Sequence, residues 1–290
     1  MKRFVFAILF ISIAFHSCQV TESIPGSEEM LFAPSINVPT KVTGNSFDVG
    51  DVIGLYVARY SGDVAPVLQL GGNYANNVPV TYNGNSWSSS PKLYWDDSKV
   101  DVYAFYPRTL VNSIDEYPFS VAIDQNVEAT SNELSAYEAS DFLWAKSKAI
   151  TRVDAVPLVF KHKMSKVVVN LLKGTDYEGD IPTDVVVKLH NTVPDALIDL
   201  YSGDVIKNPR SSVKTINALN VTQGVFTAIV VPQMLVNRVP LIEVICKGVS
   251  YLVESKFNFK SGVCHTIDIT LTDNPEKILI NIGGEIVGWE

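Results

Sequence analysis

Hydrophobic and polar positions alternate over short runs in the first half of the chain, with the two-residue period of a β-strand. Residues Phe47–Tyr60, Val78–Tyr82 and Val100–Tyr106 show this pattern and are rich in Val, Ile, Tyr and Phe, which favour strands. A shorter apolar segment, Met30–Ile36, is the first expected strand. The turn residues Asn83-Gly84-Asn85 follow the second of the longer runs and predict a β-hairpin there.

Similar apolar runs, separated by Pro and Gly, continue through the second half at the spacing of a β-sandwich. No window of helical length shows a sustained 3.6-residue period, and residues 133–147 predict only a loop with a short turn of helix. We therefore expect an all-β protein with two tandem, mostly antiparallel β-sandwich domains, over residues 46–157 and 158–290. The second-half runs are Val156–Leu172, Val185–Leu189, Ala196–Tyr201, Val225–Val231, Leu241–Lys247, Tyr251–Phe259, His265–Leu271 and Ile278–Trp289.

The first eighteen residues have the order of a secretory leader. Lys2 and Arg3 give a positive start, the apolar run Phe4–Phe15 follows, and the small residue Ser17 precedes Cys18. The run is shorter than the roughly 20 apolar residues that a membrane-spanning helix needs. This order predicts that the protein acts outside the cytoplasm.

The end of the leader, Ala14–Cys18, resembles a bacterial lipobox. In such leaders a lipid is joined to the cysteine thiol and the preceding peptide, here residues 1–17, is removed. We expect a palmitate-type lipid anchor on Cys18, with ordinary signal cleavage or a retained apolar anchor as the alternatives. Residues 19–29 are polar and acidic without periodicity, which predicts a flexible tether.

Composition and charge narrow the class of partner. The chain has 47% hydrophobic and 19% charged residues, which is a globular balance. Its formal net charge of -8 argues against a nucleic-acid partner, because no basic stripe is available to neutralise phosphates. Cys246 and Cys264 either form a disulfide in an oxidising compartment or are two buried free thiols.

The sequence offers little catalytic chemistry. The histidines lack metal-ligand spacing, and Asp96, Asp97 and Asp101 lack the Gly and closing Glu of a Ca²⁺ loop, which favours a solvated turn and no metal. No phosphate loop or nucleophile elbow is present, so we expect neither an enzyme nor a cofactor. Trp87, Tyr94 and Trp95 form either an exposed aromatic platform for a glycan or part of a sandwich core.

In their order, several segments resemble the fimbrillin-like pilins of the Bacteroidales, also called type V pilins. The resemblance covers nearly the whole chain. It rests on the lipobox, the short first strand, Thr40-Lys41 before the Phe47–Tyr60 run, and the segments Tyr94–Pro107, Asp141–Ile150, Phe160–Leu171, Thr227–Gln233 and Gly288-Trp289.

Membership of this family implies two transthyretin-like β-sandwich domains and export as a lipoprotein, here expected at the outer membrane. It also implies that an outer-surface protease, commonly arginine-specific, removes the first strand, and that a strand from another fimbrial subunit fills the groove. The matching cleavage position here is Lys41, before Val42 and within the segment 18–45, which implies a trypsin-like or lysine-tolerant enzyme.

The expected product is a cell-surface fimbrium that contacts a host or bacterial receptor. If the last run, Ile278–Trp289, pairs within its own domain, the chain is a tip subunit; if that run detaches, the chain is a stalk subunit. The alternative function is a surface lipoprotein that binds glycan through the aromatic residues and does not polymerise.

Overall fold

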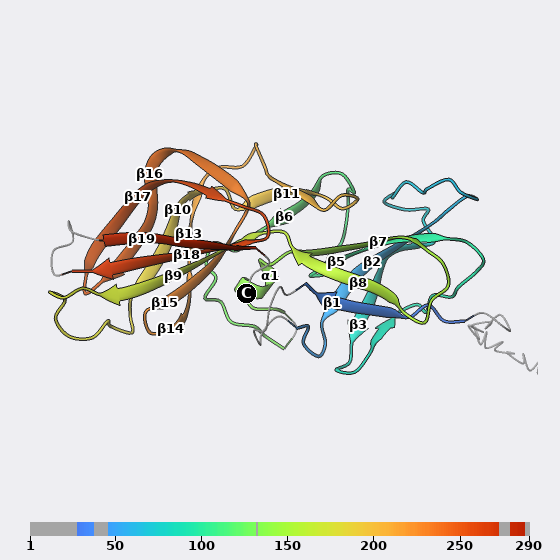
Figure 1. The fold of residues 1–290 in the computed structure, drawn as a ribbon, viewed down its shortest axis with the longest axis horizontal. Helices are drawn as coiled ribbons and strands as arrows, with labels where there is room; N and C mark the ends of the chain where they lie inside the picture. Colours follow the sequence, from blue (N-terminus) through green and yellow to red (C-terminus); the bar gives the residue numbers. More distant parts are fainter. Residues whose placement is uncertain (1–27, 38–45, 132, 273–278, 288–290) are drawn as a thin grey trace, which may run out of the picture.

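The computed structural model describes residues 28–37, 46–131, 133–272 and 279–287, and these are mostly β-strands (Figure 1). The all-β prediction is confirmed. The strands, in chain order, are β1 (Phe32–Ile36), β2 (Val52–Arg59), β3 (Ala75–Tyr82), β4 (Trp87–Ser89), β5 (Val100–Tyr106), β6 (Tyr117–Ser120), β7 (Leu143–Ile150), β8 (Val156–His162), β9 (Ser165–Lys173), β10 (Val186–Thr192), β11 (Asp195–Asp199), β12 (Asp204–Lys207), β13 (Lys214–Asn217), β14 (Leu219–Thr222), β15 (Val225–Val230), β16 (Gln233–Cys246), β17 (Val249–Phe259), β18 (Val263–Leu271) and β19 (Leu279–Val287).

One sheet of the first half has the order β1-β8-β7-β5-β2-β3-β4. Its neighbouring strands are antiparallel except for β1, which runs parallel to β8 at the edge. Just before β1, the Met30 N–H donates to the Leu93 carbonyl at 2.8 Å, and the Trp95 N–H donates to the Glu28 carbonyl at 2.9 Å. The segment that leads into β1 therefore reaches the loop after β4, and the two ends of the sheet approach each other.

Alternate side chains of this sheet enter two hydrophobic cores. Leu55 and Val57 of β2 lie in a core within the first half, together with Phe160 of β8. Tyr56 of β2 and Phe105 of β5 belong to a larger core that continues into the second half. Because both faces are covered, β2 and β5 are buried over nearly their full length.

The second half contains two further sheets, β13-β10-β16-β17 and β14-β15-β9-β18-β19. Val187 of β10 and Ile242 of β16 share the larger core with Val167 of β9 and Ile269 of β18, and all four side chains are fully buried. The two sheets therefore pack face to face as a sandwich. Figure 1 shows this half at the left and the first sheet at the right.

The two halves share structure beyond the covalent chain. Strand β6 of the first half pairs with β11 of the second, in the sheet β12-β11-β6. The buried Gln125 side chain accepts a hydrogen bond from the Ile229 N–H and donates one to the Ile229 carbonyl, both at 2.8 Å. The expected boundary between residues 157 and 158 falls inside β8, and strand pairing places the whole of β8 in the first sheet.

The helix α1 (Ala136–Ala139) lies where a short helical turn is expected. Ser135 caps it, because its hydroxyl accepts from the Glu138 N–H while the Glu138 carboxylate accepts from the Ser135 N–H. Across the described ranges, no helix combines the length and apolar character that spanning a bilayer requires.

Candidate functional site: the first strand and its cleft

Strand β1 is held along one side by parallel pairing with β8. The register aligns Phe32 with Val156 and Ile36 with Phe160. At the two ends, the Val156 N–H donates to the Leu31 carbonyl at 2.8 Å and the Asn37 N–H donates to the Phe160 carbonyl at 2.9 Å. As the edge strand of its sheet, β1 is the kind of element that another chain can replace without disturbing inner strands.

The side chains of the first strand alternate between the core and the solvent. Met30 and Phe32 point inward and are only 2% and 5% exposed, whereas Leu31 between them is 46% exposed. Burying a Phe or Met side chain stabilises a fold by roughly 1.5–3 kcal/mol. Met30 and Phe32 are therefore the two main anchors of this segment.

A cleft of about 580 Å³ follows β1 along its length. Residues 31–36 form one side of it, and Phe47, Tyr82 and Trp87 contribute to the rest of its lining. The Tyr82 and Trp87 rings stack with their centroids 5.1 Å apart, and the Phe47 ring meets the Trp87 ring edge-on at 4.9 Å. The first strand thus borders an aromatic-lined space large enough to admit further extended chain.

Polar contacts lie at two places around this cleft, one just before β1 and one near Phe47. The Lys92 ammonium lies 2.7 Å from the Glu29 carboxylate, just before β1, and this hydrogen bond raises the pKa of Lys92. Because Lys92 is exposed, the pair positions the segment more than it stabilises it. Near Phe47, the Tyr106 hydroxyl donates to Asp51 at 2.9 Å, and burial raises the pKa of both groups.

The residues expected to be processed lie outside the described ranges. These are Cys18, the expected lipid attachment site, and Lys41 and Val42, the expected cleavage position. The described residues that flank 38–45 are Asn37, which follows β1, and Ser46, which lines the cleft. Both flanks of the expected cleavage segment therefore lie beside the first strand.

The expected aromatic platform is not exposed. Trp87 and Trp95 are only 9% and 3% exposed and belong to the core of the first half. Tyr94 is half-buried, and its N–H and carbonyl both bond to the Tyr74 hydroxyl at 2.9 Å. Of the two alternatives, the structure supports a role in the core for Trp87 and Trp95.

The two cysteines of the second half are both free and buried. Cys246 lies on β16 and Cys264 on β18, in different sheets. Of the two alternatives, the structure therefore shows two buried free thiols and no disulfide between them. Burial raises the pKa of the Cys264 thiol, which keeps it protonated and unreactive at neutral pH.

The aspartates after Trp95 have structural roles, Asp96 in the loop before β5 and Asp101 on β5 itself. Asp96 pairs with Arg59 at 2.8 Å. Asp101 is only 3% exposed, which corrects the expectation of a fully solvated turn: its carboxylate accepts from the Tyr60 hydroxyl at 3.1 Å and the Ala149 N–H at 2.8 Å. Within the described part of the chain, no group of three or more His, Cys, Asp or Glu residues could hold a metal ion.

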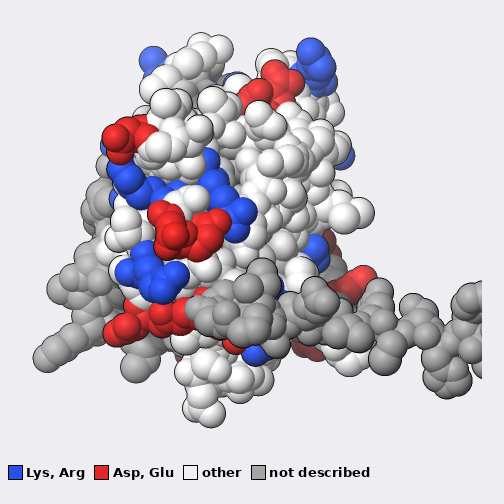
Figure 2. Space-filling model, turned by 90° about the vertical axis from the view of Figure 1, so that its right-hand side faces the viewer, with Lys and Arg blue, Asp and Glu red and all other residues white. Residues whose placement is uncertain are grey.

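The surface at the first-sheet end of the molecule carries charges of both signs. Figure 2 looks onto this end and shows Lys and Arg side chains interspersed with Asp and Glu. Such mixing favours solubility and gives this face no field of a single sign.

The last described strand, β19, pairs antiparallel with β18 of the same half, from Val263 opposite Val287 to Thr270 opposite Leu279. The expected donor segment is therefore paired within its own domain.

Sequence reasoning missed the partners of the first strand. Phe47, Tyr82 and Phe160 surround the cleft or the strand, yet none of them is singled out by a local motif. The alternation of Val156, Leu158 and Phe160 does signal an inward-facing strand. The parallel pairing of this strand, β8, with β1 has no such local signal, because the two strands are far apart in the sequence.

Two solved structures share this fold. A provisionally described cell adhesion protein from Bacteroides ovatus aligns with a TM-score of 0.70 at 15% identity, covering 91% of this chain and 98% of that one. Another from Bacteroides uniformis gives 0.65 at 18% identity, covering 87% and 96%. Both likenesses show a shared fold.

The chain belongs to the fimbrillin-like family, which matches it over residues 40–289. A Bacteroides ovatus protein provisionally named fimbrium tip subunit Fim1C is 31% identical over 159 residues. That match covers 48% of this chain and 28% of the relative, so the chain spans well under half of the relative's length. Membership of this family associates the chain with a cell-surface fimbrium rather than with an enzymatic activity.

Proposed function

We propose that this fimbrial subunit is incorporated by donor-strand exchange after proteolysis between Lys41 and Val42 removes its first strand. The observation that carries this proposal is the position of β1. It is an edge strand, anchored mainly by two side chains, beside an aromatic-lined cleft. Its loss would leave the inner strands of the first sheet intact.

Removal of β1 would leave one edge of β8 with unpaired backbone groups and two empty apolar sites, those of Met30 and Phe32. A donor strand supplies main-chain hydrogen bonds and fills such sites with alternate side chains. Two large side chains contribute about 3–6 kcal/mol in total. Ordering a donor of five residues, the length of β1, costs about 1–2 kcal/mol per residue, which matches or exceeds the side-chain contribution. The main-chain hydrogen bonds must therefore supply the remainder, and we expect the joint to last mainly through slow unfolding.

We assign the chain to the tip of the fimbrium. Strand β19 is already paired with β18, so the chain accepts a strand without offering that segment to a neighbour. The relative named as a tip subunit is in agreement with this position. A tip subunit is placed to contact a surface receptor, which fits a role in adhesion.

A lipid on Cys18 would hold the precursor at the outer membrane until processing. Two or three acyl chains on one cysteine make such an anchor effectively permanent, because each buried CH₂ contributes about 0.8 kcal/mol. Removal of residues 18–41 by the protease would also release the chain from this anchor.

The test is to cut the leaderless precursor with a trypsin-like protease and to offer it a fluorescent peptide of residues 28–37. We expect a new N-terminus at Val42, and capture of the peptide by the cut chain after the old strand is washed out in mild urea. The uncut chain and a Lys41→Ala variant should capture none. Lys207→Ala, a change at an exposed lysine on β12, is the matched control and should be cut normally.

A peptide with Phe32→Asp should fail to bind, because a charge cannot occupy the apolar site. Cut protein that captures neither peptide would contradict strand exchange. Cut protein that forms a ladder of multimers by itself would contradict the tip position while leaving strand exchange standing.

A further inference from the structure

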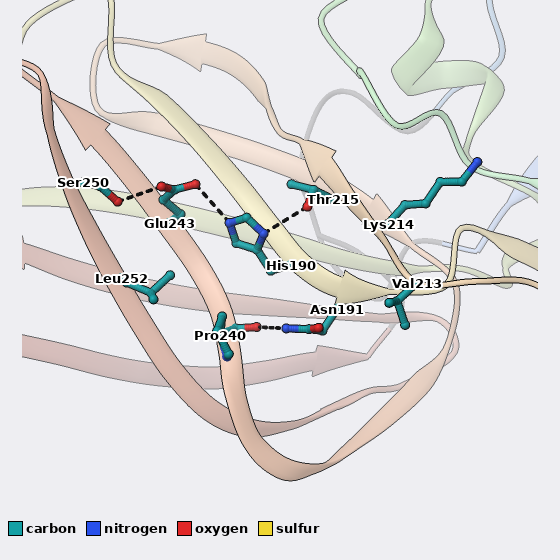
Figure 3. A pocket seen from close by; sticks show the side chains of 9 residues that line it. All are labelled: His190, Asn191, Val213, Lys214, Thr215, Pro240, Glu243, Ser250 and Leu252. Carbon is teal, nitrogen blue, oxygen red and sulfur yellow. Dashed lines mark hydrogen bonds and ion pairs between the residues drawn. The ribbon is translucent and has the colours of Figure 1, made fainter.

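A line of hydrogen-bonded polar side chains crosses the outer face of the sheet β13-β10-β16-β17. One side chain comes from each strand in turn: Thr215, His190, Glu243 and Ser250 (Figure 3). The contacts are 3.0 Å from Thr215 to His190 Nδ1, 3.1 Å from His190 Nε2 to Glu243, and 2.7 Å from the Ser250 hydroxyl to Glu243. Because each side chain stands on a paired strand, the row is preorganised.

The row forms one side of a pocket of about 410 Å³. This lies within the range of ligand sites, about 300–1,000 Å³. Figure 3 shows Leu252, Pro240 and Val213 on the other side of the pocket, while Lys214 points away from it. Leu252 is 48% exposed, so the pocket offers an accessible apolar surface opposite the polar row.

The polar row is rich in hydrogen-bond acceptors. A carboxylate offers about four acceptor positions, of which Ser250 and His190 fill two on Glu243. When the Thr215 and Ser250 hydroxyls donate along the row, their oxygens keep lone pairs for a ligand. The Lys188 ammonium, 3.9 Å from Glu243, balances the carboxylate charge. A fitting ligand therefore brings several neutral donors.

We propose that this pocket binds a neutral sugar unit of a glycan. A sugar presents adjacent hydroxyl groups to the acceptors of the row and a C–H face to Leu252 and Pro240. The site does not depend on strand exchange, since every residue in it belongs to the second half and the uncut chain already contains it.

The test is affinity electrophoresis of the uncut, leaderless chain in native gels that contain galactomannan, xyloglucan or starch. We expect at least one of these neutral polysaccharides to retard the wild-type chain. Glu243→Gln should weaken this binding by roughly tenfold or more, because it replaces a charged acceptor and disrupts the row. Glu254→Gln, the same change at an exposed carboxylate of β17 outside the pocket, should bind like the wild type.

Ser250→Ala serves as a second variant, because it removes one hydroxyl at an exposed position and should fold normally. Its binding should fall by a smaller factor, and its thermal melt should still show a single cooperative unfolding transition. Absence of retardation in all three gels would overturn the proposal. Equal retardation of the wild type and Glu243→Gln, or retardation only by a sulfated polysaccharide, would overturn it as well.

Discussion

Replacing Phe32 by Ala separates what the first strand does before processing from what it does afterwards. Phe32 is 5% exposed and, with Met30 just before β1, is one of the two inward anchors of this segment. Replacing a buried Phe by Ala typically destabilises a core by about 3–5 kcal/mol. Because an edge strand can relax toward the space left behind, we expect about 3 kcal/mol here.

The effect on thermal unfolding is large enough to measure. A loss of about 3 kcal/mol lowers the melting temperature of a chain of this size by roughly 6–12 °C. Differential scanning calorimetry of the leaderless precursor should show this drop for Phe32→Ala. The neighbouring change Leu31→Ala removes a 46% exposed side chain and should stay within about 0.5 kcal/mol of the wild type.

The second arm of the experiment repeats the measurement after cutting and strand exchange with a wild-type peptide. All three proteins should then melt alike, because residues 31 and 32 have left with the old strand. The reasoning is refuted if Phe32→Ala melts like Leu31→Ala in the precursor. It is equally refuted if the deficit of Phe32→Ala persists after exchange.

Three further predictions concern the second half and its junction with the first. Gly203→Ala should destabilise the chain by about 1–3 kcal/mol more than Gly248→Ala in urea titrations. Both glycines have positive φ, but only at Gly203 would the new Cβ lie 2.5 Å from the Trp144 ring. Equal losses of stability for the two variants would contradict this prediction. Cys246 and Cys264 should both resist a thiol reagent in the folded chain and both react in denaturant, and a non-reducing gel that shows a bridge between them would contradict the free thiols. The Ser250 hydroxyl lowers the pKa of Glu243, so this carboxylate stabilises the fold above its unfolded pKa of about 4.3 and loses that contribution as pH falls through the folded value. The stability difference between wild type and Glu243→Gln should accordingly shrink as pH falls below about 4; a difference that persists undiminished at about pH 2 would contradict the assignment.

Strands with a clear alternation were predictable from the sequence. The run Val78–Tyr82 and the turn at Asn83-Gly84-Asn85 correspond to β3 and the hairpin to β4. Segments with mixed environments were not predictable. In β7, Leu143 and Ala145 are buried, but Trp144 on the opposite face is partly covered by the second half, which hides the alternation.

Of the two candidate sites, one was predictable from the sequence and the other was not. The first strand could be read locally, because Met30 and Phe32 alternate with exposed neighbours. The polar row of the second pocket could not, since Thr215, His190 and Glu243 come from three strands whose pairing is set by tertiary packing. The buried position of Trp95 was likewise undetermined, because an aromatic residue suits both a core and an exposed binding surface.

The most direct test of strand removal is the N-terminal residue of the protein recovered from fimbriae sheared off the cell surface. Mass spectrometry of this material should find a chain that begins at Val42, with another polypeptide's segment in place of residues 32–36. A fimbrial form that begins at Cys18 and retains its own first strand would contradict the account.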